Sequence, residues 1–261
     1  MHSASHSSPQ APDRWFPTRK PLTDPRVRLF CFPFAGGSVA IYNQWAQGLP
    51  EGVELCPVQL PGRERRLSEK PIDNLSTLLD AVLPAMAPLL DRPFAFFGYS
   101  MGARISLELA RRLQARNGPR PLGLFLGAAG PPAVNNREPI HLLPEAQFIE
   151  ALRRYDGTPE EIFKHRELLE LVLPMLRADF AIAFTENGTQ TAKLAVPLSV
   201  IGSPEDKHVP TENLERWRDE TTSEDVRVRL FPGGHFFIKS QRDAILANIR
   251  EDLARWTGTA A

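Results

Sequence analysis

The sequence predicts an α/β protein with a mostly parallel central sheet and helices on both faces. Two observations lead to this prediction. Short apolar runs alternate with longer amphipathic stretches along most of the chain. The apolar runs are largely unbroken, which is typical of central strands that helices cover on both faces. The alternation itself indicates parallel strands that are joined by right-handed helical crossovers.

Six apolar runs are the candidate strands. They are Val27–Phe34, Val53–Leu60, Pro93–Gly98, Pro121–Gly130, Pro197–Ser203 and Val226–Gly234. Helical patterns cover residues 73–91, 101–118 and 240–256. In the second of these, Ile105, Leu109 and Leu113 recur at a spacing of four residues, which places them on one helical face. In the first, Pro84 and Pro88 are expected to bend or break the helix.

Residues of about 137–190 interrupt this rhythm, because they show helical patterns and no convincing strand. The sequence predicts a helix with Thr158 as N-cap, Pro159 at its first position and Glu161 closing a capping box. An apolar stripe follows, formed by Leu168, Leu169, Val172, Leu173 and Leu176. We expect a helical insertion that forms a lid over the C-terminal edge of the sheet. Its apolar stripe either lines an acyl channel or packs on the sheet, and we expect most of the leucines to pack on the sheet.

Composition and the N-terminal segment narrow the class of protein. Residues 1–25 are polar and rich in Ser and Pro, so we expect a flexible tail followed by one domain over residues 26–261. The 31 basic and 31 acidic residues balance, which does not fit a nucleic-acid-binding protein. No stretch of 18 apolar residues indicates a membrane span. Cys31 and Cys56 lie in apolar runs without metal-ligand spacing, so we expect buried thiols, no metal and a cytoplasmic protein.

The segment "FGYSMGAR" places Ser100 between Gly98 and Gly102 in the spacing G-x-S-x-G, directly after an apolar run. This spacing between a strand and a helix is typical of a strained turn that exposes a nucleophilic serine. The glycines leave room where side chains would collide with neighbouring backbone. The alternative interpretation is an ordinary tight turn that contains a serine.

A nucleophilic serine needs a base, and in this architecture the chain order is serine, acid, histidine. His235 in "FPGGHFF" follows the last predicted strand and is therefore the expected base. The acid is expected after the preceding strand, where Asp206 is preferred over Glu205. His208 lies close by in sequence and is expected to be a loop residue rather than the base.

An oxyanion hole requires two backbone N–H donors. Met101, the residue after the nucleophile, supplies one. The loop "FPFAGGS" after the first predicted strand supplies the other, with Ala35 preferred and Phe34 as the alternative. A simple glycine turn is the competing interpretation of this loop.

Taken together, "LFCFPFAGG", "VQLPGRERRL", "FGYSMGA", "DKHV" and "FPGGHFFI" resemble the type II thioesterases. These are stand-alone enzymes of the α/β-hydrolase fold that accompany polyketide synthases and nonribosomal peptide synthetases. The resemblance extends from about residue 28 to residue 256. It implies hydrolysis of stalled or aberrant acyl groups from the phosphopantetheine arm of acyl or peptidyl carrier proteins, with Ser100, Asp206 and His235 as the triad. It implies no cofactor of the enzyme's own, and we expect a monomer.

The chain departs from the family pattern at two positions. Tyr99 stands where the family commonly has histidine, and Lys207 stands where proline is frequent. Neither residue belongs to the implied triad, so the expected chemistry is unchanged. Tyr99 is expected to affect packing around the serine.

A basic cluster, Arg63, Arg65 and Arg66, invites a second hypothesis, because carrier proteins are usually acidic and a basic edge would steer them. The alternative is a solvated turn with scattered ion pairs. Three rival functions also remain at this point: a chain-releasing thioesterase, an esterase that acts on small molecules, and a non-catalytic carrier-binding protein.

Overall fold

The computed structural model describes residues 14–134, 138–155, 157–184 and 192–259. The N-terminal half of the predicted tail lies outside these residues. The remainder of that segment is not loose as expected, because Trp15 and Phe16 are 7% and 4% exposed and belong to the main hydrophobic core. Their aromatic surface is removed from water by packing beneath the sheet, and the backbone of Trp15 accepts a hydrogen bond from Gln59 N–H at 2.8 Å.

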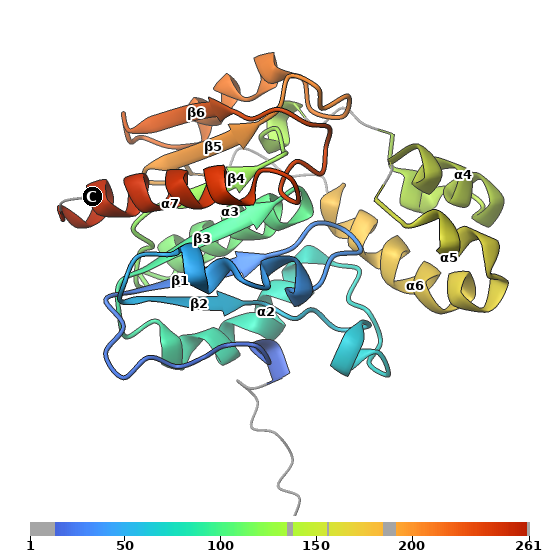
Figure 1. The fold of residues 1–261 in the computed structure, drawn as a ribbon, viewed down its shortest axis with the longest axis horizontal. Coiled ribbons are helices and arrows are strands. Elements are labelled where there is room, and N and C mark those ends of the chain that lie inside the picture. Colours follow the sequence, from blue (N-terminus) through green and yellow to red (C-terminus); the bar gives the residue numbers. More distant parts are fainter. Residues whose placement is uncertain (1–13, 135–137, 156, 185–191, 260–261) are drawn as a thin grey trace, which may run out of the picture.

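Six parallel strands form one sheet in the order β2-β1-β3-β4-β5-β6 (Figure 1). They are β1 (Val27–Phe32), β2 (Val53–Pro57), β3 (Phe94–Tyr99), β4 (Leu124–Gly127), β5 (Leu198–Gly202) and β6 (Val226–Leu230). All six predicted strands are therefore confirmed. Most are shorter than predicted at their carboxyl ends, and the apolar residues left over form the loops that carry the site.

Helices cover both faces of the sheet, as predicted (Figure 1). On one face, α2 (Leu75–Met86) and α3 (Met101–Ala115) pack in a core that includes Phe30 and Phe96. On the other, α7 (Arg242–Thr257) packs in a core that includes Phe97. Adjacent residues of one strand, such as Phe96 and Phe97, point to opposite faces, which explains why the strands read as unbroken apolar runs.

The two prolines in the first predicted helical pattern, residues 73–91, have different outcomes. Helix α2 begins after Asn74, whose side chain accepts a hydrogen bond from Thr77 N–H, and it continues through Pro84 to Met86. A short 3₁₀ helix of Ala87–Leu89 contains Pro88. The α-helical bonding thus ends near Pro88, whereas Pro84 does not break it.

Between β4 and β5 the described residues form three α-helices, which make up a lobe beside the sheet (Figure 1). We call α4 (Glu145–Tyr155), α5 (Glu160–Lys164) and α6 (Arg166–Ala183) the helical insertion. The prediction of helices here is confirmed. Its leucines mostly do not pack on the sheet as expected, because the insertion has its own hydrophobic cluster, which includes Phe148, Leu152, Leu173 and Leu176.

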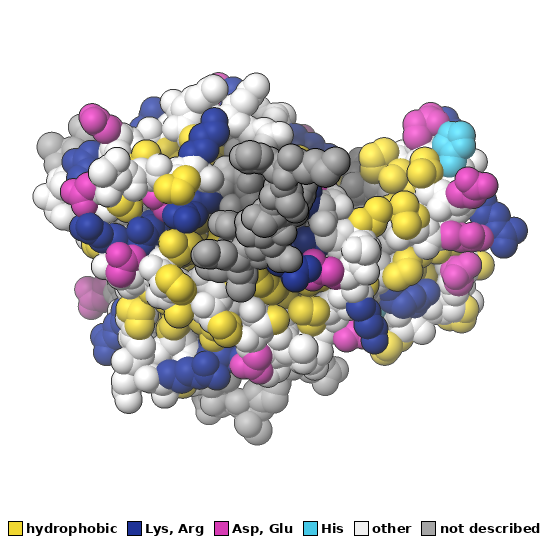
Figure 2. Space-filling model, turned by 90° about the horizontal axis from the view of Figure 1, so that it is seen from below, with side chains coloured by type: hydrophobic (Ala, Val, Ile, Leu, Met, Phe, Trp, Pro, Cys, Tyr) yellow, Lys and Arg dark blue, Asp and Glu magenta, His cyan; other side chains and the backbone are white. Residues whose placement is uncertain are grey.

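The predicted capping box is wrong. Pro159, not Thr158, is the N-cap of α5, and it makes no side-chain capping bond. His165 has extended backbone angles and separates α5 from α6, so the predicted helix start and the apolar stripe lie on two different helices. The stripe itself lies entirely on α6. Leu173 and Leu176 are buried, whereas Leu168 and Leu171 are 46% and 51% exposed. Seen from below, the lobe shows a gathering of hydrophobic side chains on its surface (Figure 2).

No helix among the described residues is long and apolar enough to cross a membrane. Cys31 and Cys56 are both free and buried, as expected. Burial raises the pKa of both thiols, which therefore stay protonated near neutral pH.

Candidate active site

Ser100 lies in the turn that joins β3 to α3, at the carboxyl edge of the sheet. Its backbone angles, φ 54° and ψ −112°, lie in a region that non-glycine residues rarely adopt. The flanking glycines are sterically required: a Cβ on Gly98 would lie 2.1 Å from Gly102 O, and one on Gly102 would lie 2.0 Å from Phe32 O. The strained turn predicted from G-x-S-x-G is therefore present.

The structure brings the side chains of Ser100, His235 and Asp206 together. His235 Nε2 lies 3.1 Å from Ser100 Oγ, and His235 Nδ1 lies 2.8 Å from Asp206 Oδ2. His235 and Asp206 are buried, whereas Ser100 is partly exposed. The hydrogen-bonded series therefore begins at a serine that solvent can reach and ends at a carboxylate that is shielded from water.

Asp206 is held as an ionised carboxylate. Its Oδ1 accepts hydrogen bonds from the N–H groups of His208 and Val209 at 2.8 and 3.3 Å. Burial raises the pKa of Asp206, but the hydrogen bond and charge of His235 and the N–H of His208 outweigh burial, so the pKa lies below its usual value of 3.8. A carboxylate in this position fixes the imidazole orientation.

Asp206, rather than Glu205, contacts the histidine. Glu205 instead accepts a hydrogen bond from Gly233 N–H at 3.0 Å, and Gly233 has a φ of 111° that favours glycine. The side chain of Ser203 donates to Gly233 O, so the loop after β5 holds the loop after β6. This bonding fixes the turn that presents His235.

Tyr99 also helps to position the loop that contains His235. Its hydroxyl is fully buried, donates to the backbone carbonyl of His235 at 2.7 Å and accepts from Ile238 N–H at 3.3 Å. Burial raises the pKa of Tyr99, so its hydroxyl remains protonated and available as a donor. At a position where the family commonly has histidine, this chain has Tyr99, whose hydroxyl group holds the loop of His235 by two hydrogen bonds.

The two expected oxyanion donors belong to residues near Ser100, one next to it in the chain and one in the pocket lining. Met101 is the first residue of α3, where backbone N–H groups point out of the helix end. Ala35 and Phe34 both line the pocket that contains Ser100. The choice between these two N–H groups stays a prediction.

Asp179 of α6 holds the loop that contains Ala35, and nothing in the sequence analysis assigned it a role. Its Oδ2 accepts from Gly36 N–H at 2.7 Å. The carboxylate also pairs with both terminal nitrogens of Arg63, at 2.6 and 2.7 Å, and Arg63 donates to Gly37 O at 2.9 Å. The sequence did contain a signal. Asp179 lies seven positions after Val172, so it falls on the apolar face of the helix, where a carboxylate is buried and needs a partner.

The hypothesis that Arg63, Arg65 and Arg66 form a basic docking edge is wrong for two of the three residues. Arg63 is buried against Asp179. Arg66 is buried, pairs with Glu69 and stacks 4.1 Å from the ring of Trp15. Only Arg65 is exposed. Two of these charges hold the fold together and are not available to a partner.

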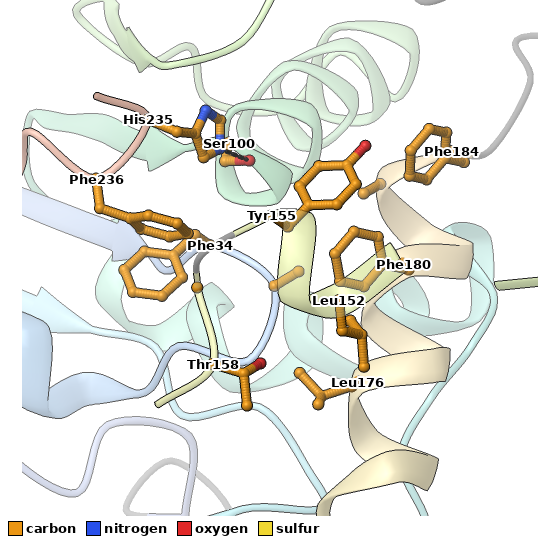
Figure 3. A pocket seen from close by; sticks show the side chains of 13 residues that line it. Phe34, Ser100, Leu152, Tyr155, Thr158, Leu176, Phe180, Phe184, His235 and Phe236 are labelled. Atoms are coloured by element: carbon orange, nitrogen blue, oxygen red, sulfur yellow. Dashed lines mark hydrogen bonds between the residues drawn. The ribbon is translucent and has the colours of Figure 1, made fainter. Parts of the chain in front are cut away.

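A mostly apolar pocket opens beside Ser100, between the body and the helical insertion (Figure 3). Phe34 and Phe236 line it from the body. Leu152, Tyr155, Leu176, Phe180 and Phe184 line it from the insertion. Thr158, the expected helix cap, is another lining residue. The described residues contain no group of three or more His, Cys, Asp or Glu side chains that could hold a metal ion.

The parallel sheet and the Ser–His–Asp arrangement at its carboxyl edge define an α/β hydrolase. Residues 27–253 match the model of the thioesterase domain family. The chain therefore belongs to this family, whose members hydrolyse thioesters.

Individual relatives are similar over nearly their whole length. The chain is 37% identical to the gramicidin S biosynthesis protein GrsT of Aneurinibacillus migulanus, covering 87% of this chain and 88% of GrsT. It is 39% identical to a Brevibacillus parabrevis protein named linear gramicidin dehydrogenase LgrE, covering 93% of this chain and 94% of LgrE. Among solved structures, the RedJ thioesterase of Streptomyces coelicolor superposes with a TM-score of 0.80 at 32% identity, covering 92% of this chain and 98% of RedJ.

Proposed function

We propose that the chain is a type II thioesterase that removes stalled or aberrant acyl groups from the phosphopantetheine arm of carrier proteins. The single observation that carries the chemistry is the hydrogen-bonded series from Ser100 through His235 to Asp206. GrsT and RedJ are named for biosynthetic pathways, and a similar structure, BorB, is titled a type II thioesterase from the borrelidin biosynthetic cluster. These names support the choice of carrier-bound substrates.

In the first half-reaction, His235 Nε2 takes the proton of Ser100 as the hydroxyl oxygen attacks the thioester carbonyl. The N–H groups of Met101 and Ala35 stabilise the oxyanion. The carbon–sulfur bond then breaks, and His235 gives its proton to the departing thiolate. Asp206 stabilises the imidazolium in between.

In the second half-reaction, His235 removes a proton from water, and the resulting hydroxide attacks the acyl-enzyme. Collapse of the intermediate releases the carboxylic acid and returns the proton to Ser100 Oγ. No cofactor of the enzyme's own takes part, because the phosphopantetheine is part of the substrate. We propose that the enzyme acts as a monomer in the cytoplasm, and the two buried free thiols are compatible with that setting.

The name of LgrE refers to a dehydrogenase, which would require hydride transfer. The sequence of this chain has no G-x-G-x-x-G segment of the kind that cradles a dinucleotide. Its Ser–His–Asp geometry serves acyl transfer, so we assign a hydrolase.

The test is to incubate the protein and its Ser100→Ala variant with acetyl- and longer acyl-carrier proteins and with the matching p-nitrophenyl esters. We expect deacylation that favours carrier proteins and falls by about 10⁴-fold or more in Ser100→Ala. Turnover of esters without turnover of carriers would instead identify an esterase. Turnover that does not depend on Ser100 would contradict the proposed mechanism.

A further inference from the structure

A second depression lies beside the pocket of Ser100 and is lined mainly by polar and charged residues. We call it the cationic groove. Arg154 from the end of α4, Lys207 from the loop after β5 and Lys239 from the loop after β6 line it. Tyr155, His235 and Phe236 line both the groove and the pocket, so the two are continuous at His235.

The charges of the groove are unbalanced. Arg154, Lys207 and Lys239 are exposed, and none of them pairs with a carboxylate that the structure describes. Glu205 is the one acidic residue among the lining residues, and it accepts the N–H of Gly233. The lining therefore carries three cationic side chains against one carboxylate, before any charge on His208.

Lys239 connects the groove to the pocket. Its Nζ lies 5.2 Å from the centre of the Phe236 ring and 5.9 Å from that of Phe34, both of which line the pocket. These contacts hold the ammonium at the junction by cation–π attraction. The groove also includes His208, which stacks on Tyr155 with ring centres 4.3 Å apart.

The chemistry at His235 determines which part of the substrate enters the groove. The leaving sulfur must lie against His235 to receive its proton. An acyl chain is apolar, and most of the side chains that line the pocket of Ser100 are apolar, Phe and Leu above all. The arm that bears the sulfur is polar and ends in a phosphodiester, which suits cationic side chains.

We propose that the cationic groove binds the phosphodiester of the pantetheine arm through Lys207, Lys239 and Arg154. The proposal rests on the proposed function, since the acyl-pantetheine thioester is the assumed substrate. Lys207, at a position where the resembling family frequently has proline, thereby gains a role in recognition.

The experiment compares two small substrates that differ only in the phosphate: an acyl-pantetheine and the same acyl-4′-phosphopantetheine. The double variant Lys207→Met/Lys239→Met should lower kcat/KM for the phosphorylated substrate by about fivefold. For the unphosphorylated substrate, kcat/KM should stay within about twofold of the wild type. The matched control is Arg65→Met/Lys70→Met. It removes two exposed charges that do not line the groove, and kcat/KM for both substrates should stay unchanged. Raising the salt concentration should reduce the wild-type preference for the phosphorylated substrate.

Three results would overturn the proposal. Equal losses on both substrates would show that the lysines act on the fold or on His235. An effect seen only with whole acyl-carrier proteins would show that they steer the acidic protein instead. A wild type that turns over both substrates with equal kcat/KM would leave the thioesterase function standing and the phosphate site refuted.

A separate measurement covers failure of the proposed function. If no thioester is turned over, binding of 4′-phosphopantetheine and of pantetheine to Ser100→Ala is measured by calorimetry. Tighter binding of the phosphorylated molecule, lost in the triple variant with Lys207→Met/Lys239→Met, supports the groove on its own. Equal binding refutes it.

Discussion

Tyr99 bonds to the loop that presents His235 and does not line the pocket of Ser100. Its hydroxyl satisfies one carbonyl and one N–H of the loop that presents the histidine. Both groups lie in a region from which water is excluded, and an unsatisfied buried polar group there is costly. Tyr99, the residue before the proposed nucleophile, is therefore expected to act as a positioning residue.

Replacing Tyr99 by Phe should destabilise the protein by about 1–3 kcal/mol, because the two backbone groups lose their partner. We also expect kcat to fall by about tenfold with a smaller change in KM, since His235 is no longer held at its hydrogen-bonding distance. Thermal unfolding and steady-state kinetics measure the two effects. Tyr42→Phe removes another buried hydroxyl, one that donates to Phe32 O at 2.8 Å, and should cost stability without the same loss in kcat. Equal losses of kcat in both variants would contradict the role of Tyr99.

Single site residues could be predicted from the sequence where neighbouring residues in the chain carry the signal. Ser100 follows from the spacing of its glycines, and Asp206 and His235 follow from their loops after successive strands. The bond of Tyr99 could not be predicted, because its acceptor carbonyl is 136 residues away in the chain. The same holds for the pair of Arg63 and Asp179, which are 116 residues apart.

Between elements, the ion pair of Arg63 and Asp179 joins α6 of the helical insertion to the loop after β2. Both side chains also bond to the backbone of the loop after β1. The two side chains are 6% and 1% exposed, so their charges depend on each other. Removing one partner of such a pair leaves a buried charge without compensation. The carboxylate has a second task, since it accepts Gly36 N–H next to the proposed donor Ala35.

These two tasks can be separated. Arg63→Met should destabilise the protein by about 3–5 kcal/mol, whereas Arg63→Met/Asp179→Leu should recover most of the lost stability. The double variant should nevertheless keep a low kcat, because Gly36 N–H has lost its acceptor and the loop of Ala35 is less well held. Denaturant unfolding and kinetics on one acyl substrate measure both. Recovery of kcat together with stability would show that the pair acts on the fold alone.

The elements themselves were predicted unevenly. The strands were recognisable because both of their faces are covered, so each is an apolar run that stands out from its surroundings. The helix start at Thr158 was not predictable, since Gly157 and Thr158 line the pocket together with body residues that are distant in the chain. A Cβ on Gly157 would lie 2.6 Å from the ring of Phe236, which comes from the other end of the chain.

Over the whole molecule, the pocket of Ser100 exists only because the body and the helical insertion face each other (Figure 3). Side chains of the insertion therefore set the room available for an acyl group. Phe180 lines the pocket, whereas Phe148 is buried in the same hydrophobic cluster and does not line it.

Phe180→Leu should raise kcat/KM for octanoyl relative to acetyl substrates by about fivefold, because a smaller wall leaves room for a longer chain. Phe148→Leu removes a similar volume from the insertion and should leave the ratio unchanged. The measurement is competition between the two acyl-carrier substrates. A shift of the same size in both variants would show that general loosening of the insertion, rather than the pocket wall, selects the acyl group.

The buried pair of Arg63 and Asp179 also makes two helices of the insertion different, because it fastens α6 to the body and does not involve α5. Moving α6 away from the body would separate two desolvated ions, which costs several kcal/mol. Helix α5 has no buried residue, and the loop before it lies against the ring of Phe236, which a Cβ on Gly157 would approach to 2.6 Å. Admission of a bulky substrate is therefore expected to displace the segment around α5, while α6 stays in place and continues to hold the loop that contains Ala35.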